Sequence, residues 1–305
     1  MRVLITGAGM IGCYAAQELL AVGDSVTFFD LAPEPSYVHH VVERPLPIVR
    51  GDIRELPALV EAVQHARPDC VIHTAGLQGT RAPYFGFQVN LVGTLNVAEA
   101  VRLCAVKRLI HASSQGVYDL SGPPEKIAEE WRSNGAGRVY QGSKVACEEV
   151  LTAYAAYYGF ELCLPRFASV YGYGPYTGGG NVGIDMHAMV RAALDGKLAP
   201  MGSGIADRND FVYVKDIAQG VRCLAHAPRL EHQVYNMGTG HCASVHDIQL
   251  ALRRILGDVQ FSREVSIRPR PALDISRARR ELGYEPRYDI EAGLRDFIKE
   301  VQRTG

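Results

Sequence analysis

The chain of 305 residues lacks several features that would indicate an unusual environment or partner. It has no apolar stretch of about 20 residues, which a membrane-spanning helix requires. Its formal net charge of −1 provides no excess positive charge to attract nucleic acid or an anionic membrane. The first apolar run begins at Val3, which leaves no room for a secretory signal. We therefore expect a cytoplasmic protein that binds small molecules, with neither nucleic acid nor membrane as a partner.

Cysteine and histidine motifs are also absent. The seven cysteines show no C-x-x-C spacing, and the ten histidines include no H-E-x-x-H motif. Cysteines spread through predicted helices and strands are typical of buried thiols in a reducing compartment. His241 and His246 are five residues apart, but this pair alone does not indicate a metal site. We predict no metal.

What the chain does have is a regular alternation of short apolar runs and helical segments. Strands separated by helices at this interval, and apolar throughout, predict a parallel sheet covered on both faces. Right-handed crossovers make this a doubly wound α/β (Rossmann) fold. The predicted strands are 3–5, 26–29, 47–49, 70–74, 108–113 and 162–166, and the predicted helices include 54–66, 90–104 and 140–158.

The first strand and helix enclose a glycine motif. Gly7, Gly9 and Gly12 form G-x-G-x-x-G in the strand, turn and helix order that a dinucleotide site requires. Gly7 allows the tight turn, Gly9 lets the backbone approach the pyrophosphate, and Gly12 permits close packing of helix on strand. The amides around Met10 and Ile11 then face the phosphates at the positive end of the helix dipole.

Asp30 ends the second apolar run, eighteen residues after Gly12. A carboxylate at this position accepts hydrogen bonds from the adenosine ribose and repels a 2′-phosphate. No Arg or Lys follows Asp30 for at least nine residues. The sequence therefore predicts NAD as the cofactor in preference to NADP.

The pattern becomes irregular at about residue 167. We predict an NAD-binding domain over residues 1–166, and over residues 167–305 a smaller C-terminal α/β lid that is mainly substrate-binding. Segments near residues 211–240 are expected to return to the main sheet as additional strands. The two segments in question are Phe211–Val214 and Val234–Met237.

A proton-transfer pair lies in the predicted helix 140–158. Tyr140 and Lys144 are four residues apart and therefore share one helix face. An ammonium beside a phenol favours the phenolate, so Tyr140 can exchange a proton with a substrate hydroxyl or carbonyl. Such a pair also arises by chance, and the glycine motif supplies the context that makes it informative.

Ser114 lies just past the predicted fifth strand, at the sheet edge where ligands bind in such folds. Its hydroxyl can hold a substrate oxygen while Tyr140 moves the proton. Alternatively, Ser113 and Ser114 cap a turn. We predict Ser114, Tyr140 and Lys144 as a catalytic set for hydride transfer to or from nicotinamide, with Lys144 also bonding the nicotinamide ribose.

These motifs resemble those of the extended short-chain dehydrogenase/reductase family, the NAD-dependent epimerase/dehydratase group, over nearly the whole chain. The segments that carry the resemblance are Thr6–Gly12, Asp30, Gly51–Ile53, His73–Gly76, Asn90–Thr94, Ser113–Tyr118, Tyr140–Lys144, Pro165–Gly172, Asp210–Asp216 and Leu273–Pro286. The resemblance implies that Asp52 and Ile53 lie near the adenine and that Asn90 supports the site. It also adds cofactor contacts at Thr74, Ala75 and Gly76.

Departures from the family pattern concern the substrate. Family members that act on sugar nucleotides usually carry Asn where this chain has Ser169 and Arg where it has Asn209. Those groups typically meet the diphosphate, and replacing a guanidinium by an amide removes a contact worth about 1.5–3 kcal/mol. Arg208 is near enough in sequence to compensate. The dehydratases of the family carry an Asp-Glu pair where this chain has Gln115 and Gly116, so we do not expect water elimination.

We expect an NAD-dependent oxidoreductase that transfers hydride at a secondary alcohol or carbonyl of a small polar substrate, such as a sugar or sugar acid. An NAD-retaining epimerase of a sugar or nucleotide sugar uses the same residues and is the close alternative. A non-catalytic NAD-sensing protein on this fold is a third possibility. The candidate substrate contacts, chosen by position alone, are Gln78, Ser114, Gln115, Ser169, Tyr171, Arg208 and Arg270.

The predicted helices 90–104 and 140–158 carry apolar residues on more than one face. The sheet cannot be faced by all of Val145, Val150, Leu151, Tyr154 and Tyr157. The family resemblance suggests a homodimer through a four-helix bundle. The alternative is a helix sandwiched within one chain.

Overall fold

The computed structural model describes residues 1–79, 82–135, 137–175, 182–200, 208–262 and 270–303. Within these residues the centre is a parallel sheet of eight strands, seven in the order β12-β8-β5-β4-β1-β2-β3 and β6 paired to β8. The strands are β1 (Arg2–Thr6), β2 (Ser25–Asp30), β3 (Ile48–Arg50), β4 (Cys70–His73), β5 (Arg108–His111), β6 (Ser113–Ser114), β8 (Glu161–Phe167) and β12 (Val234–Met237). The predicted doubly wound α/β fold is confirmed.

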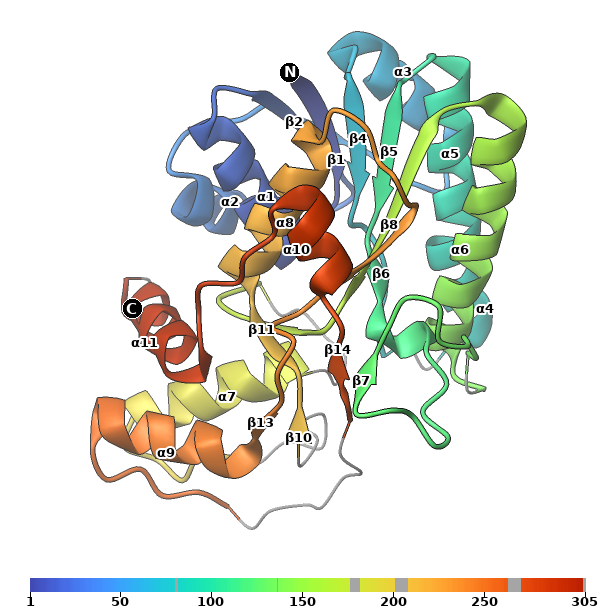
Figure 1. Cartoon of the computed structure of the whole chain (residues 1–305). Helices are drawn as coiled ribbons and strands as arrows, with labels where there is room; N and C mark the ends of the chain where they lie inside the picture. Colours follow the sequence, from blue (N-terminus) through green and yellow to red (C-terminus); the bar gives the residue numbers. More distant parts are fainter. Residues whose placement is uncertain (80–81, 136, 176–181, 201–207, 263–269, 304–305) are drawn as a thin grey trace.

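Helices cover both faces of this sheet (Figure 1). One layer consists of α1 (Met10–Ala21), α2 (Pro35–Val42) and α8 (Val214–His226), and the other of α3 (Leu56–Ala66), α5 (Gly93–Leu103) and α6 (Val139–Tyr158). Alternate residues of β1 enter two separate cores: Val3 and Ile5 pack with the first layer, and Leu4 packs with the second. Strands buried on both sides explain the continuous apolar runs in the sequence. None of the described helices is long and apolar enough to cross a membrane.

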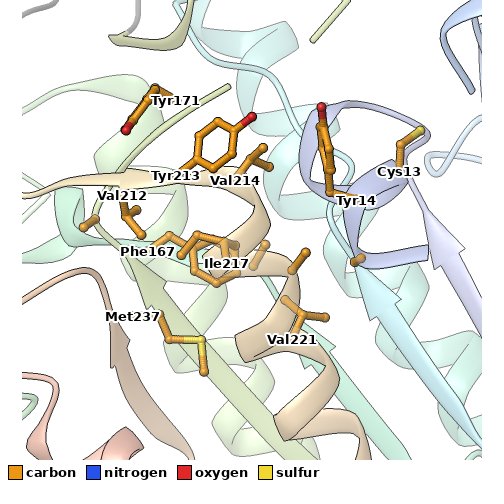
Figure 2. Packing of buried hydrophobic residues seen from close by; sticks show 14 of the residues in the cluster. Cys13, Tyr14, Phe167, Tyr171, Val212, Tyr213, Val214, Ile217, Val221 and Met237 are labelled. Carbon is orange, nitrogen blue, oxygen red and sulfur yellow. The ribbon is translucent and has the colours of Figure 1, made fainter. Parts of the chain in front are cut away.

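The core of the first layer joins the two halves of the chain. Figure 2 shows one cluster that contains Tyr14 of α1, Phe167 of β8, Ile217 and Val221 of α8, and Met237 of β12. All five side chains are buried. Because α1 follows the first strand and the other elements come from the second half of the chain, this core holds the glycine turn against the rest of the sheet.

Small paired strands lie at the carboxyl edge of the sheet, and all of them except β7 come from the second half of the chain. These pairs are β7 (Lys126–Ile127) with β14 (Ala272–Leu273), β9 (Ser169–Tyr171) with β11 (Phe211–Tyr213), and β10 (Arg208–Asn209) with β13 (Ala243–Ser244). The remaining helices are α4 (Pro83–Phe87), the π-helix η1 (Gln88–Val92), the 3-10 helix η2 (Gln115–Val117), α7 (Val182–Leu194), α9 (Val245–Leu256), α10 (Ser276–Leu282) and α11 (Ile290–Gln302). In Figure 1 the paired strands lie below the sheet, on the side where β5 continues into β6.

One of the two segments expected to return to the main sheet does so. Val234–Met237 is β12 and pairs with β8, whereas Phe211–Tyr213 pairs only with β9, so its expected place in the main sheet was wrong. The physical reason is that β12 occupies the open edge of β8, which leaves β9 as the partner for β11. The proposed division into residues 1–166 and 167–305 stays a prediction.

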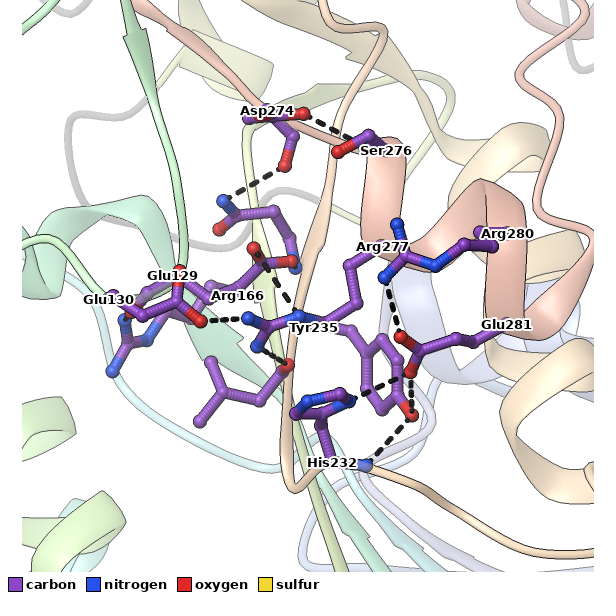
Figure 3. Close-up of polar contacts among 12 residues, drawn as sticks. Glu129, Glu130, Arg166, His232, Tyr235, Asp274, Ser276, Arg277, Arg280 and Glu281 are labelled. Atoms are coloured by element: carbon purple, nitrogen blue, oxygen red, sulfur yellow. Dashed lines mark hydrogen bonds and ion pairs between the residues drawn. The ribbon is translucent and has the colours of Figure 1, made fainter.

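Arg277 of α10 ties the C-terminal segment to the main sheet. Its guanidinium donates to the Val234 carbonyl at 3.1 Å and pairs with Glu129 and Glu130 (Figure 3). The side chain of Asn236 in β12 donates to backbone carbonyls in β7 and just after β14. These contacts hold α10 and the β7–β14 pair against β12.

Asp216 in the first turn of α8 has an unusual carboxyl group. It is buried, and it accepts hydrogen bonds from the backbone N–H groups of Arg287 at 2.8 Å and Tyr288 at 3.1 Å. Burial raises the pKa of Asp216 to about 6, from a reference value of 3.8, although the two hydrogen bonds oppose this shift. The folded protein therefore binds this proton more tightly than the unfolded chain does.

We predict a pH-dependent difference in stability between the wild-type protein and Asp216→Asn. The contribution of Asp216 is fully present below its unfolded pKa and is lost as the pH rises through about 6. When the pH falls from 7.5 to 5, the free energy of unfolding of the wild type should therefore rise by about 1 kcal/mol relative to that of the variant. Urea unfolding of both proteins at each pH measures this difference in stability. The contributions of all other titrating groups are common to the two proteins and cancel in the difference. A difference that is constant with pH would contradict the prediction.

Candidate functional site

The glycine turn between β1 and α1 leaves no room for side chains at two of its three glycines. Gly7 has φ of +95°, and a Cβ there would lie 2.7 Å from the backbone nitrogen of Ala75. A Cβ on Gly12 would lie 2.0 Å from the carbonyl oxygen of Gly7. These two glycines are therefore required by the close approach of α1 and the loop after β4 to the turn.

Gly9 differs from the other two glycines because the space beside it is open. No described atom outside its own chain neighbourhood lies within 4 Å of the position of a Cβ on Gly9. Gly9 is the N-cap of α1, without a side-chain capping bond, and α1 begins with Met10 and Ile11 and has no acidic residue in its first turn. Open space in front of a helix N-terminus suits a pyrophosphate group.

Asp30 stands at the end of β2, directly beside the glycine turn. Its carboxylate accepts hydrogen bonds from the backbone N–H groups of Ala8 at 2.7 Å and Ala32 at 2.8 Å. These two donors fix the carboxylate next to the turn, while each oxygen keeps a further lone pair for a hydroxyl donor. This arrangement suits the predicted contact with an adenosine ribose.

The Asp52 carboxylate forms an ion pair with its neighbour Arg54, which the sequence analysis does not predict. The guanidinium of Arg54 pairs with the Asp52 carboxylate at 2.5 Å and holds the pKa of that carboxyl below its usual range. The next residue, Ile53, is buried, and a Cβ on Gly93 of α5 would lie 2.6 Å from its side chain. The Asp52 and Ile53 pair thus lies between the end of β3 and the start of α5.

The loop after β4 is bonded to the glycine turn. Thr74 donates from its hydroxyl to the carbonyls of Thr6 at 2.9 Å and Gly7 at 3.1 Å. The backbone N–H of Ala75 also donates to the Thr6 carbonyl, at 2.9 Å. Thr74, Ala75 and the adjacent Gly76 are therefore part of the same loop cluster as the glycine turn.

Asn90 connects that loop to the helix that carries the predicted catalytic pair. Its side chain accepts from the Leu77 N–H at 2.7 Å and donates to the Leu77 carbonyl at 2.9 Å and the Ser143 hydroxyl at 3.0 Å. Asn90 lies in η1, and π-helical turns of this kind are frequent at functional sites. The predicted substrate contact Gln78 directly follows Leu77, so Asn90 positions its backbone as well.

Lys144 and Tyr140 lie on one face of α6, as the spacing predicts. The buried Lys144 ammonium donates to the carbonyl of Ala112 at 2.6 Å and lies 5.8 Å from the centre of the half-buried Tyr140 ring. Among the described residues, no carboxylate forms an ion pair with this ammonium. A buried cation that is held by a neutral carbonyl keeps its full charge available to a neighbouring phenolate.

Ser114 stands at the end of β6, beside this pair in the fold. Its oxygen accepts a hydrogen bond from the Gly116 N–H at 3.0 Å and so caps η2, which is the turn-capping alternative. Its hydroxyl proton is still available to a substrate oxygen, because the capping bond uses a lone pair. Ser113 points elsewhere and donates to Glu148, which pairs with Arg166 in the interior.

Two buried histidines below the site were not singled out from the sequence. His73 hydrogen bonds to the hydroxyls of Thr6 and Thr94, and its ring centre is 5.0 Å from that of His111. Burial, followed by the charge of Lys144, lowers the pKa of His73 to about 3 and places that of His111 well below its usual value. Both imidazoles are therefore neutral near pH 7. The sequence signal that could have pointed to these two histidines is their position as the last residues of the adjacent strands β4 and β5.

Three neutral side chains beyond Ser114 form a buried network. Gln115 donates from Nε2 to the hydroxyl of Ser169 at 2.7 Å, and Asn209 donates from Nδ2 to the same hydroxyl at 2.5 Å. All three residues are buried, and they come from η2, β9 and β10. The structure therefore brings the predicted contacts Gln115 and Ser169 together next to Ser114, with Asn209 as a third member.

Arg208 does not compensate for the missing guanidinium at Asn209. Successive residues of a strand point to opposite faces, and in β10 Asn209 is buried while Arg208 is exposed. Arg208 and Arg270 line a cavity that includes none of Ser114, Tyr140 and Ser169. The expectation that Arg208 takes over the diphosphate contact on the Asn209 side is therefore wrong.

Tyr171 also faces away from the site. It is fully buried, its ring centre is 5.3 Å from that of Tyr213, and a Cβ on Gly293 of α11 would overlap its hydroxyl (Figure 2). The candidate substrate contact at Tyr171 is thus a core residue.

Within the described ranges, no group of three or more His, Cys, Asp or Glu side chains could hold a metal ion.

Comparison with known proteins identifies the family. Residues 3–238 match the model of the NAD dependent epimerase/dehydratase family. The chain is 31% identical to a UDP-glucose 4-epimerase of Mycolicibacterium smegmatis, with 98% of each chain covered. It also resembles the UDP-glucose 4-epimerase of Thermotoga maritima with UDP-glucose, with a TM-score of 0.85, 25% identity, and 100% and 99% of the two chains covered. The Thermus thermophilus UDP-glucose 4-epimerase in complex with NAD gives a TM-score of 0.83 at 25% identity, with 99% of each chain covered.

The chain is a member of the NAD-dependent epimerase/dehydratase family of extended short-chain dehydrogenases/reductases. It is an enzyme of that family and its cofactor is NAD, so these predictions are confirmed. The residues present fit this group: the open space at Gly9 accepts a pyrophosphate, and Asp30 stands where a ribose would lie. The roles of the individual residues stay predictions.

We predict opposite results for alanine at two of the glycines. In Gly9→Ala the methyl group enters open space, so the stability should be unchanged, but it occupies the place of the pyrophosphate and should weaken NAD binding about tenfold or more. In Gly12→Ala the methyl group meets the Gly7 carbonyl, and the free energy of unfolding should fall by about 2 kcal/mol or more.

Thermal unfolding and NAD titration of both variants check this pair of predictions. Gly23→Ala is a control for the loss of a glycine outside the turn, although its φ of +87° adds a small cost. Full NAD affinity in Gly9→Ala would contradict the placement of the pyrophosphate.

Proposed function

We propose that this enzyme is an NAD-dependent epimerase that inverts a hydroxyl-bearing carbon of a nucleotide sugar. The observation that carries the proposal is the Lys144 ammonium, held by the Ala112 carbonyl beside Tyr140, with the Ser114 hydroxyl at the same edge of the sheet. The relatives support the substrate class, because those at 98% coverage of this chain include UDP-glucose and UDP-glucuronate 4-epimerases.

In the proposed reaction the three residues act on one substrate hydroxyl. Tyr140 acts as a phenolate that the charge of Lys144 stabilises, takes the hydroxyl proton and becomes a neutral phenol, while Ser114 donates a hydrogen bond to the substrate oxygen. Bound NAD would supply the acceptor for the hydride from the same carbon and, once reduced, the donor that returns it. After the substrate carbonyl has turned its other face toward the site, Tyr140 returns the proton to the oxygen and the opposite configuration results.

The neutral network suits the remaining hydroxyl groups of a sugar. Gln115, Ser169 and Asn209 present amide and hydroxyl groups, which both donate and accept hydrogen bonds. None of the three provides a carboxylate for the acid and base steps of water elimination. This supports epimerisation or oxidation over dehydration.

A second candidate is a dehydrogenase that releases NADH after oxidising a free sugar or sugar acid. The specific observation in its favour is that Asn209 and Ser169 stand where relatives that act on sugar nucleotides usually carry Arg and Asn. Without that guanidinium the site beside Ser114 lacks a charge-assisted contact to a diphosphate. Steady accumulation of NADH with a free sugar, and no binding of UDP-sugars, would favour this candidate over the epimerase.

We propose that the enzyme is a homodimer through the outer face of α4, α5 and α6. These helices lie together on one side of the molecule (Figure 1). Apolar side chains on and between them are exposed in the single chain. The exposed residues are Tyr84, Phe85, Phe87, Val92, Leu103, Tyr157 and Tyr158. The α5 and α6 helices of two copies form a four-helix bundle flanked by the two α4 helices, which removes this apolar surface from water.

The first prediction from the proposed reaction concerns Tyr140→Phe. We expect turnover of UDP-glucose to fall by a factor of about 10² to 10⁴, because the proton acceptor is lost. NAD affinity should change little, since the Lys144–Ala112 bond does not involve the phenol. Product analysis by NMR measures the rate, with Tyr154→Phe on the same helix as the matched control. A Tyr140→Phe variant with undiminished turnover would contradict the acid-base role of Tyr140.

The second prediction concerns assembly. Sedimentation or light scattering should give twice the mass of one chain. Tyr157→Glu should shift the equilibrium toward the monomer, because Tyr157 is 82% exposed in the single chain and lies in the proposed interface, where a charge would be buried. Leu198→Glu is the control, since Leu198 is 61% exposed but lies beyond α7, away from these helices. A monomeric wild type would refute the dimer.

A further inference from the structure

The cavity lined by Arg208 and Arg270 lies beside β10, on the face away from the neutral network. Its volume is about 340 Å³, and its charged lining residues include Lys126, Arg208 and Arg270, with Glu125 as the lining carboxylate. Asn209 points from the same strand toward Ser169, so the strand itself separates this cavity from the network beside Ser114. The cavity is therefore a distinct site at the carboxyl end of the sheet.

Backbone contacts hold the two arginines of the cavity next to each other. The Arg270 N–H donates to the Arg208 carbonyl at 2.8 Å, and three residues later the Leu273 N–H donates to the buried carboxylate of Asp210 at 3.2 Å. The β7–β14 pairing aligns Ala272 with Lys126, which brings the ammonium to the same cavity. The three cations thus come from three elements that are tied together before any ligand binds.

The described residues place Glu125 on the lining of this cavity and the Asp274 carboxylate within electrostatic reach of Lys126, but neither forms an ion pair with a lining cation. Arg270 is half-buried, and no described carboxylate forms an ion pair with it, with Arg208 or with Lys126. The Asp247 carboxylate lies within electrostatic reach of Arg208, and it accepts hydrogen bonds from Ser244 as part of the cap of α9. Burial, and secondly the charge of Arg138 at the start of α6, lower the pKa of Arg270.

Clustered cations of this kind attract a compact anion. A guanidinium presents a planar fork of donors that matches a phosphate or a carboxylate, and an ammonium adds a point charge. Three like charges in a concave site repel one another unless an anion lies between them. Cations on a fully exposed surface are solvated by water and need no bound anion. Arg270 is half-buried, so its charge is less well solvated.

We propose that the cavity lined by Lys126, Arg208 and Arg270 binds the phosphate or carboxylate group of a small anionic molecule. The group belongs either to the acidic part of the substrate or to a separate effector, and both sources share this chemistry. The inference stands apart from the proposed hydride transfer, because it concerns binding alone.

The test is isothermal titration of the NAD-saturated protein with inorganic pyrophosphate at low salt, so that NAD already occupies the glycine turn. We expect saturable binding that Arg270→Gln weakens about tenfold or more, the loss of one charge-assisted contact. Arg208→Gln should weaken binding to a similar extent, and because Arg208 is exposed its replacement leaves the core intact. Arg229→Gln, at an exposed site after α8, is the control for the removal of one positive charge.

Two outcomes would overturn the proposal. One is the absence of saturable binding, and the other is equal affinity in Arg270→Gln, Arg208→Gln and Arg229→Gln. If pyrophosphate binding depends on Arg208 and Arg270, a titration in the presence of UDP distinguishes the two sources of the anion. Competition by UDP assigns the cavity to the diphosphate of a nucleotide, and binding of pyrophosphate alongside UDP assigns it to a separate effector anion.

Discussion

The hydrogen bond from the Lys144 ammonium to the Ala112 carbonyl is the contact on which the candidate site depends. It fixes α6 against the end of β5, and so places Tyr140 beside the serine that ends β6. The rest of the edge supports this contact, because Asn90 ties the loop after β4 to Ser143, the residue before Lys144. The neighbouring His73 and His111 are neutral, and among the described residues no carboxylate forms an ion pair with the Lys144 ammonium. A buried ammonium without a carboxylate is costly, and a phenolate that forms beside it during turnover is the anion that offsets this cost.

The distribution of charge around the edge separates two kinds of recognition. Beside Ser114 the contacts are amides and a hydroxyl, which suit the hydroxyl groups of a sugar but offer no cation to an acidic group. The cations lie on the other face of β10, where Arg208 and Arg270 share a cavity. Among the described residues, an acidic group of a substrate therefore finds its guanidinium partners in that cavity and not in the network beside Ser114.

Much of the fold and part of the site were predictable from sequence, because those features depend on residues close together in the chain. The glycine turn, Asp30 at the end of a strand and the Tyr140–Lys144 spacing each follow from the geometry of one strand or one helix. Other features depend on tertiary packing. Phe211–Tyr213 has the pattern of a main-sheet strand, but β12 already occupies the edge of β8. Tyr171 and Arg208 are polar residues near the expected site, and only the pairing of β9 with β11 and of β10 with β13 determines that they face elsewhere. The ion pair of Asp52 with Arg54 depends on a local turn that no motif encodes.

The central claim is that Tyr140, Lys144 and Ser114 carry out a reversible hydride transfer at a single carbon of a nucleotide sugar. The most direct measurement is the fate of the label when UDP-glucose deuterated at carbon 4 is incubated with the NAD-saturated enzyme. The account predicts that the inverted sugar forms and retains deuterium at that carbon, while absorbance at 340 nm shows no lasting increase. Unchanged UDP-glucose, or deuterium that leaves the sugar and accumulates in released reduced cofactor, would contradict it.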